Sequence, residues 1–151
     1  MSTNFLQELF GLLDMKGVLL GNANTERYCL DQRGRYLGAA LAVAKPRNTE
    51  EVVAIVQLCA RHGVPIVPQG GNTSLCGAAT PDASSTALVM SFERMNRIIA
   101  VDAGNNTLTV EAGVLLADAQ AAARDADRLF AADWGASGSC QIGGALATNA
   151  G

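Results

Sequence analysis

Residues 64–77 have the sequence VPIVPQGGNTSLCG, in which a short apolar run passes directly into a glycine-rich turn. A continuous apolar run such as residues 64–67 is typical of a buried strand in a parallel sheet. Open α/β sheets bind ligands at the carboxyl ends of their strands, where this turn would lie. Gly70 and Gly71 allow successive amides to point toward one place and form an anion-binding nest, with a diphosphate as the natural ligand. Because Gly-Gly-Asn also suits a plain turn, the motif alone favours neither interpretation.

Two common phosphate-binding motifs are absent from the sequence. A Walker loop requires lysine directly after its second glycine. Gly138 and Gly143 have the required spacing, but Gly144 occupies the lysine position. The chain also has no G-x-G-x-x-G run, so the dinucleotide-binding fingerprint fails as well. An anion bound by the turn would therefore be held in another way.

The sequence before the turn predicts a βαβ unit. Residues 41–44 predict a strand, and Asn48 with Glu51 predicts a capped helix start. The apolar face of this helix consists of Val52, Ile55, Val56 and Cys59. Gly63 suits the left-handed position after the helix, and the helix dipole favours His62 beside it, which makes a catalytic role for this histidine the weaker interpretation. Together with residues 64–67, the unit has two parallel strands joined by a right-handed crossover.

The N-terminal part precedes this unit. Residues 5–13 predict a helix, because their apolar side chains recur at helical spacing. Residues 22–35 are polar and irregular, and we expect them to cross the surface. We therefore divide this half of the chain into an N-terminal helix with a surface segment, residues 1–37, and a first α/β subdomain, residues 38–80.

The chain changes character after the turn. Three strands are predicted at residues 87–92, 97–101 and 107–112, and the last two form an antiparallel hairpin through a linker rich in glycine and asparagine. Alanine-rich residues 115–126 predict a helix. Residues 81–151 thus start a second, antiparallel subdomain, and the fold class is α+β.

A second glycine-rich segment, residues 135–144, has the sequence GASGSCQIGG. It combines small residues with hydroxyl groups, and a short helix is predicted at residues 142–149. Helix N-termini attract anions, so the segment is a second candidate ligand loop. A flexible linker without a binding role would have a similar composition.

Composition excludes several classes of function. The net charge is −3, the pI is near 5.0 and no basic stripe is present, which argues against a nucleic-acid partner. No apolar run is long enough to span a bilayer, and the acidic start is a poor signal peptide, so we expect a cytoplasmic protein. The four cysteines form no C-x-x-C pair and His62 is the single histidine, so no metal site is predicted.

Four segments in order carry a specific resemblance. Residues 64–77 resemble the pyrophosphate loop of the vanillyl-alcohol-oxidase/PCMH-type FAD-binding family, nearest its D-lactate, glycolate-oxidase-subunit and D-2-hydroxyglutarate dehydrogenase branch. FERMNRI at residues 92–98 and TVEAGV at residues 109–114 are similar to two further family motifs. Residues 135–151 resemble its second FAD-contacting segment. The resemblance covers residues 41–151 and implies a PCMH-type FAD-binding fold, with FAD extended between two subdomains. It also implies that the second subdomain is incomplete, so we expect an unpaired sheet edge that promotes self-association.

The resemblance assigns cofactor contacts to both glycine-rich segments. The assigned residues are Pro68, Gln69, Gly70, Gly71, Asn72, Thr73, Ser74 and Gly77 in the first, and Gly135, Ala136, Ser137, Gly138, Ser139, Ile142, Gly143, Gly144, Thr148 and Asn149 in or just after the second. Some relatives attach FAD through a histidine where this chain has Asn72, and others through a cysteine near the position of Ser137. We therefore expect noncovalent FAD.

The resemblance implies oxidation of a small 2-hydroxy acid by hydride transfer to the flavin. It places the substrate arginines, metal-ligand histidines and catalytic base in a later domain, so we expect no catalytic or metal residue before Gly151 and no activity of this chain alone. Two alternatives remain. One is a sugar or alcohol oxidase, or a peptidoglycan-precursor reductase relative, of the same superfamily. The other is a folded fragment that binds no flavin and acts only as an interaction module.

Overall fold

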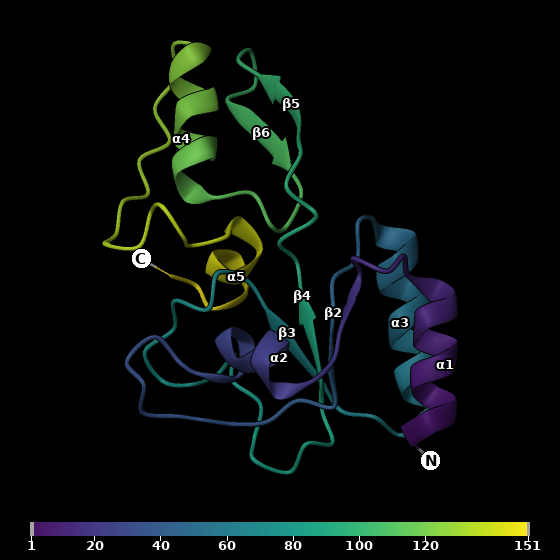
Figure 1. Cartoon of the computed structure of the whole chain (residues 1–151). Coiled ribbons are helices and arrows are strands. Elements are labelled where there is room, and N and C mark those ends of the chain that lie inside the picture. Colours follow the sequence, from purple (N-terminus) through teal and green to yellow (C-terminus); the bar gives the residue numbers. More distant parts are fainter. Residues whose placement is uncertain (1, 151) are drawn as a thin grey trace.

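A four-stranded sheet forms the first lobe of the molecule, and the computed structural model describes the chain over residues 2–150 (Figure 1). The sheet order is β1 (Val18–Leu19), β2 (Ala42–Ala44), β4 (Leu88–Ser91) and β3 (Ile66–Gln69). The central strand β4 is parallel to both β2 and β3, and β1 is antiparallel to β2. We call this part, with helices α1–α3, the sheet lobe.

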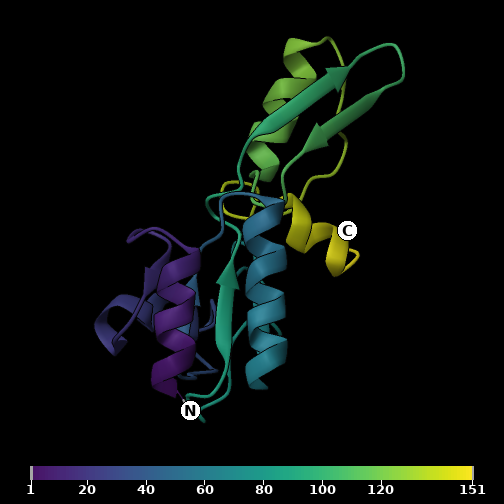
Figure 2. The same ribbon diagram turned by 90° about the vertical axis from the view of Figure 1, so that its right-hand side faces the viewer.

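Helices cover both faces of this sheet, because successive side chains of each strand point alternately to one face and to the other. On one face, Ala42, Ala44, Leu88 and Met90 form a buried core with α1 (Ser2–Leu12) and α3 (Thr49–His62). These two helices run side by side (Figure 2). On the other face, Val43 and Val89 pack against Tyr28 of α2 (Asn22–Cys29). Successive residues of a strand point to opposite faces, so one short strand serves both cores.

The predicted βαβ unit is confirmed in its helix ends and in the direction of its strands. The side chain of Asn48 accepts a hydrogen bond from the Glu51 amide at 2.8 Å. Gly63 ends α3 in the left-handed region, with φ 64°. The predicted apolar face is wrong at Val56, which is 44% exposed, whereas Ile55 and Leu58 are fully buried. His62 lies at the helix end and its Nε2 is 2.9 Å from Glu8 Oε1.

Three expectations about the sheet lobe are wrong. Residues 22–35 are not irregular throughout, because α2 forms there and buries Tyr28 and Cys29. The strand expected to be buried at residues 64–67 is instead an edge strand over Ile66–Gln69, with half-buried side chains at its start. No new sheet begins at residue 87, because β4 lies between β2 and β3. The subdomain boundaries remain a prediction, and this pairing favours a boundary after Ser91 rather than at residue 81.

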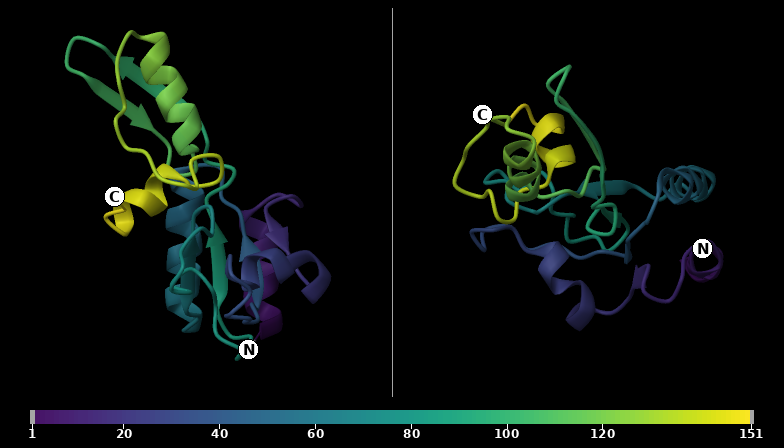
Figure 3. Two further views of the ribbon diagram at one scale, coloured as in Figure 1. Left: turned by 90° about the vertical axis from the view of Figure 1, so that its left-hand side faces the viewer. Right: turned by 90° about the horizontal axis from the view of Figure 1, so that it is seen from above.

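The second part, which we call the hairpin lobe, extends from one end of the sheet lobe (Figure 3). Strands β5 (Ile98–Asp102) and β6 (Thr107–Val110) form the predicted antiparallel hairpin, and Asn106 takes a positive φ of 55° in its turn. Helix α4 (Leu116–Asp125) packs against the hairpin. Helix α5 (Ile142–Ala147) lies at the junction of the two lobes (Figure 1). The mixed α+β architecture predicted from the sequence is thus confirmed.

Candidate cofactor-binding site

Gly71 and Ala136 stand in different glycine-rich segments and are 65 residues apart in the sequence. The two segments nevertheless meet at the junction of the lobes. A Cβ atom built on Gly71 would lie 1.8 Å from the carbonyl oxygen of Ser139. A Cβ atom on Gly70 would lie 3.6 Å from the Cα of Gly144. The two backbones therefore lie so close together that there is no room for a side chain at position 71, and only glycine fits there. The two segments are therefore in direct backbone contact, which a site shared by both would require.

The other two motifs hold the second segment in place. The amide of Gly143 donates to Ala112 O at 2.8 Å, and the amide of Ile142 donates to Val114 O at 2.9 Å. A Cβ on Gly113 would lie 1.9 Å from Phe92 O, so residues 109–114 are in turn packed against residues 92–98. All four motifs thus form one continuous structural unit.

These bonds change the role expected for the start of α5. Two of its first amides already donate to residues 112 and 114. They are not free to bind an anion, and α5 has only six residues. At the N-terminus of α5, which the sequence predicted as an anion site, these amides instead hold the second segment against residues 112–114.

In the first segment, two side chains are bound to the protein itself. Gln69 is 2% exposed, and its Nε2 donates to Tyr28 O at 2.8 Å and to Ala79 O at 2.7 Å. Asn72 Nδ2 donates to Leu30 O at 2.8 Å. These bonds attach both ends of the turn to the C-terminal end of α2, so the side chains of Gln69 and Asn72 hold the turn's shape.

The backbone of this turn is what remains for a ligand. Among residues 2–150, the amides of residues 71–74 donate no hydrogen bond to any backbone or side-chain acceptor. Asn72 has a positive φ of 52°, and successive amides around such a residue converge as a nest. Buried or half-buried amides without partners are costly, so a bound anion would satisfy them. This is the arrangement that the sequence suggested for a diphosphate.

The remaining predicted residues either border open space or contact other parts of the protein. Gly135 and Gly138 border open space, since a Cβ on either meets nothing within 4 Å. Ala136 O accepts the amides of Ser139 and Cys140 and closes a tight turn. Thr148 Oγ1 donates to Gly144 O at 2.9 Å, and no hydrogen bond within the described chain joins Thr148 or Asn149 to the first segment. Pro68 is exposed at the end of β3, and Gly77 packs against the ring of Tyr36.

Sequence reasoning missed one residue of this site, Gln141. Its side chain is 7% exposed, yet its Oε1 has no hydrogen-bond partner among the residues that the structure describes. A Cβ on Gly70 would lie 3.6 Å from that oxygen, so the carboxamide faces the first segment. An orphaned buried amide costs about 1–3 kcal/mol. One polar atom is therefore left without a partner at this junction within the described chain, and a glutamine in a glycine-rich run gives no sequence signal of this.

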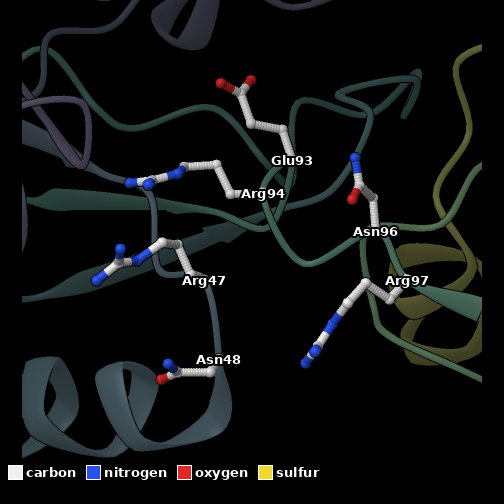
Figure 4. A pocket seen from close by; sticks show the side chains of 6 residues that line it. All are labelled: Arg47, Asn48, Glu93, Arg94, Asn96 and Arg97. Atoms are coloured by element: carbon white, nitrogen blue, oxygen red, sulfur yellow. The ribbon is translucent and has the colours of Figure 1, made fainter. Parts of the chain in front are cut away.

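A pocket beside the connection between the lobes is lined by the six side chains that Figure 4 labels. The lining residues are Arg47, Asn48, Glu93, Arg94, Asn96 and Arg97. Each arginine has an acidic partner: Arg94 binds Asp14 at 2.8 Å, Arg97 binds Glu111 at 2.6 Å and Arg47 binds Glu51. Because these charges are compensated, the pocket fits a structural ion-pair network better than an anion site.

Two kinds of feature are absent from the part of the chain that the structure describes, a metal-ligand cluster and a membrane-spanning helix. Within residues 2–150, no group of three or more histidine, cysteine, aspartate or glutamate side chains could hold a metal ion. The helices of the same part of the chain include none long and apolar enough to cross a membrane.

Comparison with known proteins agrees with this geometry. Curated relatives include D-2-hydroxyglutarate dehydrogenase from Xanthomonas citri pv. viticola, which is 42% identical over 129 residues, 85% of this chain and 27% of that protein. Glycolate oxidase subunit GlcD from Bacillus subtilis is 36% identical over 130 residues, 86% of this chain and 27% of that protein. The chain thus spans little more than a quarter of the length of these relatives.

Solved structures share the fold. Alkyldihydroxyacetonephosphate synthase superposes with a TM-score of 0.86 at 21% identity, over 96% of this chain and 29% of that one. p-Cresol methylhydroxylase superposes with a TM-score of 0.63 at 18% identity, over 83% of this chain and 25% of that one. These matches confirm the PCMH-type fold.

The unpaired amides of the first segment fit a diphosphate, and the orphaned Oε1 of Gln141, which accepts hydrogen bonds, fits a hydroxyl or N–H donor elsewhere in a cofactor held between the two backbones. The family model that matches residues 40–151 is that of the FAD binding domain. It covers most of the chain and includes both glycine-rich segments. The chain belongs to this FAD binding domain family, and its cofactor is FAD.

Proposed function

We propose that this chain is the FAD-binding portion of a flavin-dependent oxidoreductase that oxidises a small 2-hydroxy acid. The observation that carries the proposal is the junction of the two glycine-rich segments, with free amides on one side and the Gln141 carboxamide on the other. The substrate class rests on the relatives, which are named D-2-hydroxyglutarate dehydrogenase, D-lactate dehydrogenase and glycolate oxidase subunit. FAD, when bound, would accept the hydride removed from the substrate.

In this proposal the residues of the chain bind and orient the cofactor. The amides of residues 71–74 hold its diphosphate, and the hydroxyl groups of Thr73 and Ser74 add donors. Residues 137–144 line the other side, and Thr148 and Asn149 extend it toward the flavin. We assign no catalytic base to this chain, because its single histidine is bound to Glu8 at the far end of α3.

We further propose that FAD is bound without a covalent link. Asn72 occupies the place where some relatives have a linking histidine, and its amide donates to Leu30 O. Ser137 occupies the other linking position. An amide and a hydroxyl group do not form the flavin bonds that histidine or cysteine forms, so acid should release the cofactor.

The test uses the visible absorption of the purified chain. FAD is added, the sample is desalted, and the retained flavin spectrum is recorded before and after acid precipitation. We expect yellow colour that leaves the protein in acid. Colour in the precipitate would refute the noncovalent link, and a colourless protein would favour the fragment that binds no flavin. A panel of D-2-hydroxyglutarate, D-lactate, glycolate, a sugar and an alcohol, assayed with a dye acceptor on an active oxidoreductase that contains this chain, tests the substrate class.

A second proposal concerns self-association and compartment. All five residues of β5 are exposed, including Ile99 at 62%, and the strand lies at a sheet edge. Such an edge pairs readily with another strand, so we propose that this chain self-associates through β5. A monomer in sizing chromatography at high concentration would contradict this, and Ile99→Lys should dissolve the association if it is found. The reduced cysteines fit the proposed cytoplasmic location.

A further inference from the structure

The turn that presents the free amides is held by α2, and α2 is held by a carboxylate outside both glycine-rich segments. Asn72 Nδ2 donates to Leu30 O at 2.8 Å and approaches Arg27 O at 3.5 Å. Gln69 Nε2 donates to Tyr28 O at 2.8 Å. The turn therefore reaches the C-terminal end of α2 from both of its ends.

The end of α2 is in turn bound to Glu93. Tyr28 is 3% exposed, and its hydroxyl group lies 3.0 and 3.1 Å from the two carboxylate oxygens of Glu93. Arg27 Nη2 lies 3.1 Å from the same carboxylate, and Lys45 Nζ lies 3.2 Å from it. Glu93 follows directly after β4, the central strand of the sheet. One carboxylate thus connects the end of α2 to the centre of the sheet.

Burial distinguishes this cluster from an ordinary surface ion pair. The side chain of Glu93 is 30% exposed and that of Lys45 is 14% exposed. Burial, followed by the Glu93 charge, raises the pKa of Tyr28 to about 12, so the phenol keeps its proton and can donate it to the carboxylate. Arg27 also stacks over the Tyr28 ring at 4.5 Å. The cluster therefore fixes the two residues of α2 whose carbonyl groups face the turn.

We propose that Glu93 is a positioning residue for the diphosphate-binding turn and acts on it through α2. Glu93 touches neither glycine-rich segment by hydrogen bond in the part of the chain described here. Glu93 fixes the side chains of Arg27 and Tyr28 at the end of α2. The side-chain amides of Asn72 and Gln69 donate to carbonyl groups at the same end of this helix. The inference rests on the proposed role of the turn in holding FAD, but the mechanical connection can be tested without the cofactor.

The experiment is backbone ¹⁵N relaxation on the full chain, without FAD, which gives the NMR order parameters of residues 70–76 whether or not their amides are hydrogen-bonded. Glu93→Gln keeps the shape of the side chain and removes its charge. We expect the order parameters of the turn to fall from about 0.85, typical of a rigid backbone, to below about 0.6, typical of a flexible one. Glu8→Gln is the matched control, because Glu8 binds Arg61 and His62 in the same lobe but has no bonded route to the turn.

Two further variants separate positioning from general loss of stability. Tyr28→Phe keeps the ring in the core and removes its hydroxyl group, which donates to Glu93 and accepts a hydrogen bond from Arg27, so it should lower the order parameters of the turn with little change in Tm. Asn72→Ala cuts one connection at the other end. Because part of the effect of Glu93 passes through Asn72, the double variant Glu93→Gln/Asn72→Ala should lower the order parameters by less than the sum of the two single effects.

Equal order parameters of residues 70–76 in Glu93→Gln and Glu8→Gln would overturn the proposal, and so would fully additive effects in the double variant. If Glu93→Gln does not fold, the Tyr28→Phe result decides in the same way. FAD retention is measured separately on the same proteins. Retention by the wild type with an unchanged turn in the variants would refute positioning alone, whereas lowered order parameters in a chain that retains no FAD would refute the cofactor role alone.

Discussion

Gly71 and Ser139 are in direct backbone contact, such that a Cβ atom on Gly71 would lie 1.8 Å from the Ser139 carbonyl oxygen. No side chain fits there, and the obstacle is backbone rather than a movable side chain. A substitution at Gly71 would therefore separate the two glycine-rich segments even before any cofactor is bound.

Gly71→Ala should accordingly lower both stability and FAD retention. Overpacking of this kind costs about 1–3 kcal/mol. Gly138→Ala is the matched control, because a Cβ on Gly138 meets nothing within 4 Å. We expect it to change the free energy of unfolding by no more than about 0.5 kcal/mol. Urea denaturation measures the free energy of unfolding of the two variants, and flavin absorption after desalting measures FAD retention. Equal stability of the two variants would show that the segments do not meet as described.

Gln141→Leu should raise stability and lower FAD affinity at the same time. The buried Oε1 of Gln141 has no partner in the described chain, so replacing the carboxamide by an apolar group of similar size removes a cost of about 1–3 kcal/mol. If the carboxamide serves FAD, the same change removes a cofactor contact.

Gln120→Leu is the control for this prediction, because Gln120 Nε2 donates to Ala132 O at 2.7 Å and loses a made bond. It should lower Tm, whereas Gln141→Leu should raise it. Thermal unfolding without FAD and fluorescence titration with FAD provide the two measurements. A Gln141→Leu protein that is destabilised like Gln120→Leu would mean that the carboxamide has a structural partner.

Asp14 should contribute to stability only above the acid range. Hydrogen bonds from Arg94 are the main reason that the pKa of Asp14 falls from its ordinary 3.8 to about 2. Because the folded state favours the charged carboxylate, this stabilisation is complete above pH 3.8 and is lost as the pH falls toward about 2. The difference in unfolding free energy between wild type and Asp14→Asn should shrink over that interval.

The control for Asp14 is Asp125→Asn, since Asp125 is exposed and forms no ion pair within residues 2–150. Its difference from the wild type is recorded over the same interval as the baseline for a charge removed outside any ion pair. Urea denaturation at closely spaced pH values measures both differences. A flat profile for Asp14→Asn would mean that Arg94 does not hold this carboxylate in solution.

The sequence predicted the local features of the fold well. The Asn48 cap, the left-handed Gly63 and the β5–β6 hairpin each depend on a few neighbouring residues, and each is present. Helix α2 was missed because its residues are polar and have weak helix propensity. It forms because Tyr28 and Cys29 are buried against the sheet, which is a tertiary effect.

Long-range features were harder to predict. Nothing in residues 88–91 tells that this strand inserts between β2 and β3, because strand order depends on how the whole sheet packs. In the candidate site, glycine patterns identified both segments. They did not show which groups of the first segment bind the protein itself and which are left for a ligand. The side chains of Gln69 and Asn72 hold the turn through α2, and only the backbone amides are left for a ligand. That distinction depends on partners about 40 residues away in sequence.

Cys76 should be the most reactive of the four cysteines. It is exposed, and its Sγ lies 3.2 Å from Ser74 Oγ, a hydrogen bond that lowers the pKa of the thiol. Burial raises the pKa of Cys29 and raises that of Cys59 to about 11, and Cys140 is also buried. Since the thiolate is the reactive form, iodoacetamide at neutral pH should modify Cys76 first.

Mass spectrometry of the partly alkylated chain measures this order directly. Ser74→Ala should slow the reaction at Cys76 because it removes the bond that favours the thiolate, and Cys76→Ser should leave only slow alkylation. Cys76 lies two residues after Ser74 in the first glycine-rich segment, so bound FAD should also slow its modification. Alkylation of Cys29 or Cys59 at the rate of Cys76 would contradict the burial of those thiols, and a rate at Cys76 that saturating FAD leaves unchanged would place the cofactor away from this segment.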